Sequence, residues 1–242
     1  MTESDAIHPE DGVVLVVLAH PDDPEWFCGG TIARWAANGR EVHYCLLTRG
    51  DKGSDDDLTP PEKLAKIRES EQRAAAKKLG VHHVRFLDEA DGYLMPSLAL
   101  RADIVRVIRD VRPDTVITCD PTNFFPSNRY INHADHRAAG QVTLDAVFPA
   151  ARSALYFPEI YKEEGLQPHK VREVYVAGAQ HPNITIDITD FLTQKISALS
   201  EHRSQIGDIH SLEERLRKSM LDPDSSPEEP RYIERFRRIE LR

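Results

Sequence analysis

Two clusters of histidine and aspartate, far apart in the chain, carry the side chains best suited to chemistry. They are His20, Pro21, Asp22 and Asp23, and later His133, Ala134, Asp135 and His136. A catalytic zinc site typically takes three protein ligands from histidine and carboxylate side chains and leaves one position for water. His20, Asp23 and His136 would make such a set. We therefore expect about one zinc or other divalent ion per chain.

The remaining polar residues of the two clusters suit proton transfer. Asp22 is adjacent to a metal ligand without being needed as one, so we expect it to take a proton from the metal-bound water. His133 and His136 are three residues apart at the start of a predicted helix and can point the same way. Asp135, between them, can hold one ring by a hydrogen bond. Helix capping alone would explain one such cluster, but not histidines in both.

The first cluster follows a stretch with the pattern of a buried strand. Residues 13–19 form a continuous apolar run rich in valine, which is typical of a parallel strand covered on both faces. Ligands bind at the carboxyl ends of strands in open α/β sheets, so this edge should carry the chemistry. The turn that follows holds two carboxylates where a pyrophosphate would need bare amides. A dinucleotide cofactor is therefore not expected.

Strand and helix patterns alternate over the first two thirds of the chain. We expect strands at 13–19, 42–47, 84–87, 115–118, 171–177 and 184–188, and helices at 25–38, 59–80, 98–111, 136–147 and 189–204. Residues 154–170 and 221–230 are expected to be irregular, and the charged end 231–242 to pack back on the sheet. The alternation predicts an α/β fold with a Rossmann-like, largely parallel sheet, helices on both faces and an irregular C-terminal third. We expect a single domain over residues 1–242.

Composition narrows the classes of function. The chain has 40 acidic and 31 basic residues and a formal net charge of −9, which disfavours nucleic acid because phosphate binding needs a clustered basic face. No apolar run approaches the roughly 20 residues that span a bilayer, and residues 1–5 lack a signal-peptide pattern. Three cysteines without repeated spacing suit a reducing compartment. We expect a cytoplasmic protein that acts on a small molecule.

Four motifs resemble those of the PIG-L/LmbE-like zinc-dependent de-N-acetylases, in the same order. They are residues 19–23 (AHPDD) with 28–33 (CGGTIA), the loop 48–53 (TRGDKG), the helix segment 68–71 (RESE), and residues 133–137 (HADHR). The resemblance runs from about residue 13 to about residue 140. Relatives often assemble as homo-oligomers, which the resemblance also implies here.

The resemblance implies a role for each matching residue in catalysis. Asp22 would be the general base. His133 would stabilise the tetrahedral oxyanion or act as general acid, with Asp135 orienting it. Zinc would polarise the amide carbonyl and lower the pKa of its water. The zinc ligands would be His20, Asp23 and His136.

Two further matching residues would recognise the substrate. Arg68 would hold hydroxyl or phosphate groups, and Asp51 occupies the place where relatives carry a sugar-binding glutamate. Asp51 is one methylene shorter than that glutamate, which leaves the substrate open. Pro24 stands where relatives carry a glutamate directly after the first motif, so the role of that glutamate is not transferred to Glu25.

We therefore predict a zinc hydrolase that removes an N-acetyl or other N-acyl group from an amino sugar or similar small molecule. An amidase acting on a larger thiol or antibiotic-type conjugate is the alternative among enzymes. A zinc-containing binding protein without turnover is the alternative from another class. It is disfavoured because Asp22 and His133, the expected proton-transfer groups, are both present.

Overall fold

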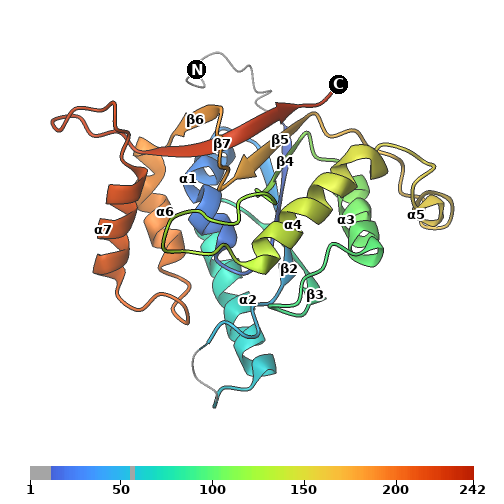
Figure 1. Ribbon diagram of the computed structural model, residues 1–242, viewed down its shortest axis with the longest axis horizontal. Helices are drawn as coiled ribbons and strands as arrows, with labels where there is room; N and C mark the ends of the chain where they lie inside the picture. Colours follow the sequence, from blue (N-terminus) through green and yellow to red (C-terminus); the bar gives the residue numbers. More distant parts are fainter. Residues whose placement is uncertain (1–11, 55–57) are drawn as a thin grey trace.

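A seven-stranded sheet runs through the computed structural model, which describes residues 12–54 and 58–242 (Figure 1). Residues 1–5, tested above for a signal peptide, lie outside the described part. The strands are β1 Val13–Leu18, β2 Glu41–Thr48, β3 His83–Glu89, β4 Thr115–Cys119, β5 Glu173–Ala177, β6 Ile184–Asp187 and β7 Ile233–Glu240. Their order is β3-β2-β1-β4-β5-β7-β6. β1 to β5 pair in parallel, whereas β7 is antiparallel to both neighbours, which confirms the predicted, largely parallel α/β sheet.

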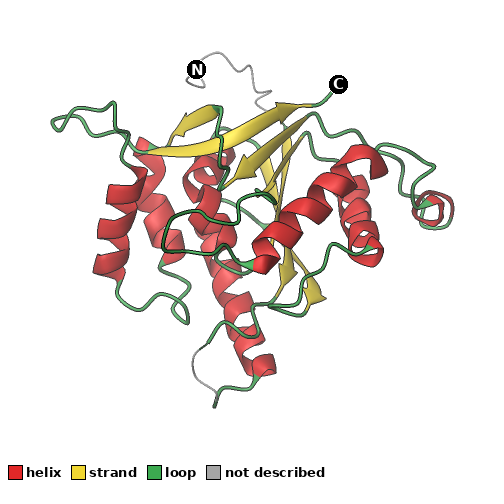
Figure 2. Cartoon of the chain, in the orientation of Figure 1, coloured by secondary structure: helices red, strands yellow, loops and turns green. Residues whose placement is uncertain are grey.

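Helices cover both faces of this sheet (Figure 2). The α-helices are α1 Asp23–Ala37, α2 Pro61–Lys78, α3 Leu98–Val111, α4 Ala134–Asp145, α5 Pro158–Lys162, α6 Leu192–Leu199 and α7 Ile209–Met220. A π-helical turn, η2 Ala146–Ala150, extends α4, and a 3₁₀ turn, η3 Thr189–Phe191, precedes α6. In the described chain no helix is both long and apolar enough to cross a bilayer.

β1 is apolar at every position because both of its faces are buried. Val14, Val16 and Leu18 belong to the core formed with α1, α2, α6 and α7. Leu15 and Val17 belong to the core formed with α3 and α4. Successive side chains of a strand point to opposite faces, so a strand covered on both sides needs apolar residues at every position.

The strand order reverses between β1 and β4, and this reversal positions the functional residues. The chain leaves β1 toward one edge of the sheet and leaves β4 toward the other. The loops after the two strands therefore separate at their carboxyl ends, which is where open α/β sheets form a ligand-binding crevice. The turn after β1 carries the first predicted cluster, and α4, which follows β4, begins within the second.

The last third of the chain contains elements that the patterns did not indicate. The predicted helix at 189–204 ends at Leu199, and a separate helix, α7, follows it. The charged end 231–242 does return to the sheet, as a strand, β7, between β5 and β6. Glu234 of β7 is buried because its carboxylate accepts from Lys195 at 2.6 Å and from backbone amides of α1. A buried charge needs such partners, and they come from distant segments.

Candidate active site

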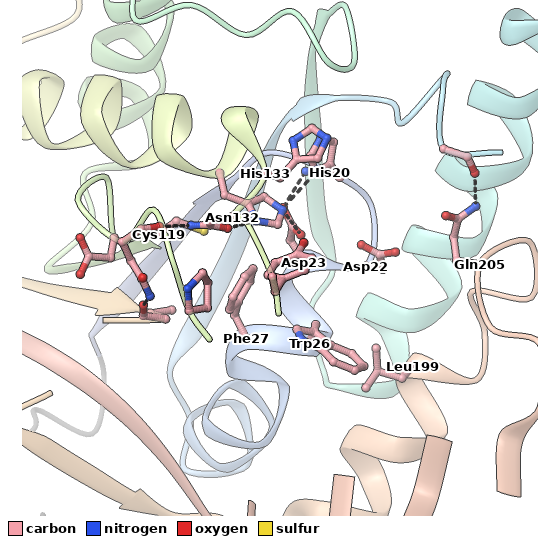
Figure 3. Close-up of a pocket in the computed structure, with 18 of the residues that line it drawn as sticks. His20, Asp22, Asp23, Trp26, Phe27, Cys119, Asn132, His133, Leu199 and Gln205 are labelled. Atoms are coloured by element: carbon pink, nitrogen blue, oxygen red, sulfur yellow. Dashed lines mark hydrogen bonds and ion pairs between the residues drawn. The ribbon is translucent and has the colours of Figure 1, made fainter. Parts of the chain in front are cut away.

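A cavity of about 760 Å³ opens at the carboxyl ends of β1 and β4. Trp26 and Phe27 of α1 form part of its wall (Figure 3). The structure thus brings the two clusters, far apart in the sequence, to one place. The lining of the cavity includes residues of both clusters: His20, Asp22, Asp23, His133 and His136.

Three of these side chains, His20, Asp23 and His136, converge on one point. One nitrogen or oxygen atom of each lies within 4.8 Å of the others. Nδ1 of His20 is 3.5 Å from one oxygen of Asp23, and Nε2 of His136 is 3.1 Å from the other. Two imidazoles and a carboxylate form a donor set that suits zinc and related divalent ions.

Three carboxylates surround the ring of His20. Its Nε2 lies 3.1 Å from Asp91 and 3.2 Å from Asp135. Burial lowers the pKa of His20, but hydrogen bonds to Asp135, Asp23 and Asp91 outweigh it and raise the pKa to about 12. Because ionised carboxylates only accept hydrogen bonds, Nε2 donates to Asp91 and Asp135. Nδ1 is then the nitrogen left for a metal ion.

The orientation of His136 is fixed from its far side. Its Nδ1 lies 3.1 Å from Oδ1 of Asn132. The amide nitrogen of Asn132 donates to the carbonyl of Asn123 at 2.8 Å, so the amide oxygen is the atom that faces the ring. Nδ1 therefore carries the proton, and Nε2 presents a lone pair toward Asp23.

The structure corrects the expected partner of Asp135. Its carboxylate does not orient His133 but accepts from the backbone N–H groups of Gly92 and Leu94 and from Nε2 of His20. His133 is held by the backbone N–H of Asp135, which donates to its Nδ1. Burial and the charge of His20 lower the pKa of His133. The neutral ring then carries its proton on Nε2 and can donate it.

Asp22 lies in the cavity wall beside the three converging side chains. It precedes α1 with a φ of 92°, a conformation that is uncommon outside glycine. Its backbone N–H donates to Oε1 of Gln72 at 2.8 Å, and its carboxylate is 3.3 Å from Nη2 of Arg68. Burial and the charge of Asp23 raise the pKa of Asp22 to about 6. That value suits a general base that works near neutral pH.

Arg68 of α2 is almost wholly buried at the edge of the cavity. Its guanidinium donates to the carbonyls of Gly50 at 3.1 Å and Pro21 at 2.7 Å. A Cβ at Gly50 would overlap this guanidinium, so the close approach requires glycine. Asp51 is not among the residues that line the cavity; its carboxylate accepts from the backbone N–H of Asp91. Of the two predicted substrate residues, Arg68 therefore lines the cavity and Asp51 does not, although the Arg68 guanidinium lies against the loop that carries Asp51.

A buried polar network behind Asp22 was missed by the sequence analysis. Glu25 accepts two hydrogen bonds of 3.0 Å from the amide of Gln72 and lies 3.1 Å from Nε2 of His202. Burial lowers the pKa of His202, but the hydrogen bond to Glu25 outweighs it and raises the pKa. Nothing local in the sequence marks this network. Asp91 was also missed. It closely follows the carboxyl end of β3, so the expectation that ligands bind at the carboxyl ends of strands could have found it.

Comparison with known proteins identifies the family. Residues 15–147 match the family model "PIG-L: GlcNAc-PI de-N-acetylase". Diacetylchitobiose deacetylase of Thermococcus kodakarensis is 35% identical over 195 residues, which cover 79% of this chain and 69% of the relative. The solved structure of N,N'-diacetylchitobiose deacetylase from Pyrococcus horikoshii, at 30% identity, matches with a TM-score of 0.85 over 95% of this chain and 84% of that one.

A second kind of relative is similar over a shorter part of this chain. The 1D-myo-inositol 2-acetamido-2-deoxy-alpha-D-glucopyranoside deacetylase of Rhodococcus opacus is 33% identical over 159 residues, 55% of this chain. The match spans 52% of that relative, about half its length. The resemblance seen in the four motifs is confirmed by these matches, and the chain belongs to the PIG-L family of de-N-acetylases.

Proposed function

We propose that this protein is a zinc-dependent N-deacetylase that acts on an acetylated amino sugar. The observation that carries the proposal is the convergence of His20, Asp23 and His136 beside Asp22 in one cavity. The relatives described above support it, because their names are those of deacetylases of acetylated amino sugars or their conjugates.

The charges around the converging side chains favour a divalent cation. Three carboxylates, those of Asp23, Asp91 and Asp135, contact the ring of His20. A fourth, that of Asp22, lies close enough to Asp23 for their charges to repel. A doubly charged ion offsets this concentration of negative charge better than one protonated histidine does. When bound, such an ion lowers the pKa of water and polarises an amide carbonyl.

Asp22 carries the proton in this reaction, and His133 stabilises the oxyanion. Asp22, ionised at neutral pH, accepts a proton from the water that attacks the amide carbon. His133 donates its Nε2 proton as a hydrogen bond to the oxygen of the tetrahedral intermediate. The C–N bond then breaks, and the leaving amine takes the proton held by Asp22. Arg68 keeps the carboxylate of Asp22 turned toward the cavity.

The cavity wall suits a sugar. Trp26 and Tyr130 line it with 42% and 54% of their surfaces exposed, and flat aromatic faces pack well against the C–H groups of a sugar ring. Arg68, which also lines the cavity, is our candidate for contact with substrate hydroxyls, and Asp51 acts through the backbone of Asp91.

The proposal also covers the domain organisation, location and assembly of the enzyme. We infer one domain over the chain, a cytoplasmic location and assembly into homo-oligomers. All three cysteines are buried and unpaired, which supports a reducing compartment.

An activity panel tests the function. Zinc-loaded protein is incubated with N-acetylglucosamine, N,N'-diacetylchitobiose and N-acylated thiol conjugates, and free amine and acetate are measured. We expect release from an acetylated amino sugar, and its loss in Asp22→Asn. Release from the larger conjugates alone would favour the amidase, and no release from any substrate by folded, metal-loaded protein would favour the binding protein.

A further inference from the structure

A second group of metal-ligating side chains lies at the other end of the strands, away from the cavity. Glu41 and His43 are at the start of β2, and His83 begins β3. One nitrogen or oxygen atom of each lies within 4.8 Å of the others. The amino ends of these strands are at the edge away from the cavity, which opens at the carboxyl ends. The group is therefore separate from the candidate active site.

The strand geometry places the three side chains beside one another. Glu41 and His43 are two residues apart on β2 and so lie on the same face of the sheet. His43 pairs in register with His83, and the two rings stack with centroids 4.3 Å apart and planes 11° from parallel. Both Nε2 atoms approach one oxygen of Glu41, at 2.7 Å from His43 and 3.6 Å from His83.

These spacings are close to those around a bound ion. Zinc bonds of about 2.0–2.1 Å in tetrahedral geometry put neighbouring ligand atoms about 3.3–3.5 Å apart. A shift of the Glu41 carboxylate, half exposed in this structure, brings both contacts into that range. Because the two rings are stacked with planes 11° from parallel, both must also turn about their side-chain torsions before their lone pairs can meet at one ion. The backbone needs no rearrangement, since the strand register already places the two residues side by side.

The positive charges nearby are already neutralised. Arg85 and Arg73 line the same hollow of about 510 Å³. The guanidinium of Arg85 is 2.7 Å from Asp110, and that of Arg73 is 2.8 Å from Glu69. Each arginine therefore pairs with a carboxylate other than Glu41, although Glu69 is shared with Arg49. Glu41 remains available to a cation.

We propose that Glu41, His43 and His83 bind a second divalent transition-metal ion. Two imidazoles and one carboxylate suit zinc, nickel or copper and leave coordination positions for water. The ion ties the edge strand β3 to β2 and takes no part in deacetylation. This inference does not rest on the proposed function.

Zinc binding to the purified full-length chain tests it. After equilibrium dialysis against zinc chloride, elemental analysis should give two ions per chain in the wild type, and one each in His83→Gln and His136→Ala. The double variant should hold none. His181→Gln, which removes an exposed histidine outside both groups, should keep two.

The deacetylation rate and the melting temperature give two further measurements. The side chain of His83 is 57% exposed, so His83→Gln should fold normally, and its deacetylation rate at saturating zinc should match the wild type. Zinc should also raise the melting temperature of His136→Ala but not that of the double variant. A zinc content in His83→Gln equal to that of the wild type would overturn the proposal.

Discussion

The same sheet carries sets of two histidines and a carboxylate at both ends of its strands. His20, Asp23 and His136 lie at the carboxyl ends, buried or half-buried, and the far nitrogen of each ring is held by Asp135 and Asp91 or by Asn132. Glu41, His43 and His83 lie at the amino ends and are mostly exposed. Within residues 12–54 and 58–242, Glu41 provides the carboxylate contacts of both of these rings.

The difference between the two proposed metal sites lies in what stands behind their ligands. Partners behind the ligands fix their ring orientation and raise their basicity, which strengthens metal binding. Asp91 follows β3, Asn132 lies in the loop after β4, and Asp135 is in the first turn of α4. All three thus come from segments that follow parallel strands, at the carboxyl ends where ligands bind. At the amino ends the strand register supplies the ligands without such partners. We therefore expect the cluster of His20 to bind metal more tightly than that of His43.

Asp22, the proposed proton-transfer group, belongs to the first cluster, and its loss should have the largest effect. Asp22→Asn should lower kcat by about 10²–10⁴, because general-base catalysis contributes that much. Metal content should stay at the wild-type level, because Asp22 is not one of the converging ligands. The measurement is amine release alongside elemental analysis. Loss of metal together with activity would make Asp22 a ligand.

The partners behind the ligands should have the next largest effect. Asp135→Asn should weaken zinc binding at the first cluster by about 10–100-fold, since it removes a charge that holds the ring of His20. A competition titration with a chromophoric chelator measures this affinity. Asp145→Asn, on the same helix but bonded to Arg101, is the matched control. Equal affinities in the two variants would show that the buried carboxylate does not support the site.

The network behind Asp22 should have the smallest effect, visible in stability. The folded-state pKa of His202 is raised above its unfolded value of about 6.5. Its charged hydrogen bond to Glu25 therefore stabilises the fold fully below that pH, and the contribution is lost as pH rises through the raised pKa. His202→Gln should lower the free energy of unfolding by about 1.5–3 kcal/mol near pH 6, and by less in alkali.

Urea unfolding of wild type and variant at several pH values measures this difference. His210→Gln, an exposed histidine on α7, should change little at any pH. A deficit in His202→Gln that grows with pH would have the wrong sign for a charged histidine beside Glu25.

The sequence reveals the first cluster because its residues follow a recognisable buried strand. The run 13–19 is apolar at every position, and the polar residues after it must lie at the strand end. β7 could not be predicted in the same way. Its charged residue Glu234 is buried because Lys195 of α6 and backbone N–H groups of α1 bind its carboxylate. The partner of Asp135 depends likewise on a long-range contact, as the loop after β3 brings Gly92 to its carboxylate. The family resemblance implied His133 as the partner instead.

Zinc titration of the metal-free enzyme tests the central claim most directly. In the His83→Gln background, which leaves only the first cluster, amine release from the best acetylated amino sugar should rise in proportion to zinc and level off at one equivalent. Adding His136→Ala should abolish the rise. Full activity before zinc is added, or the same titration curve with His136 removed, would contradict deacetylation at this site.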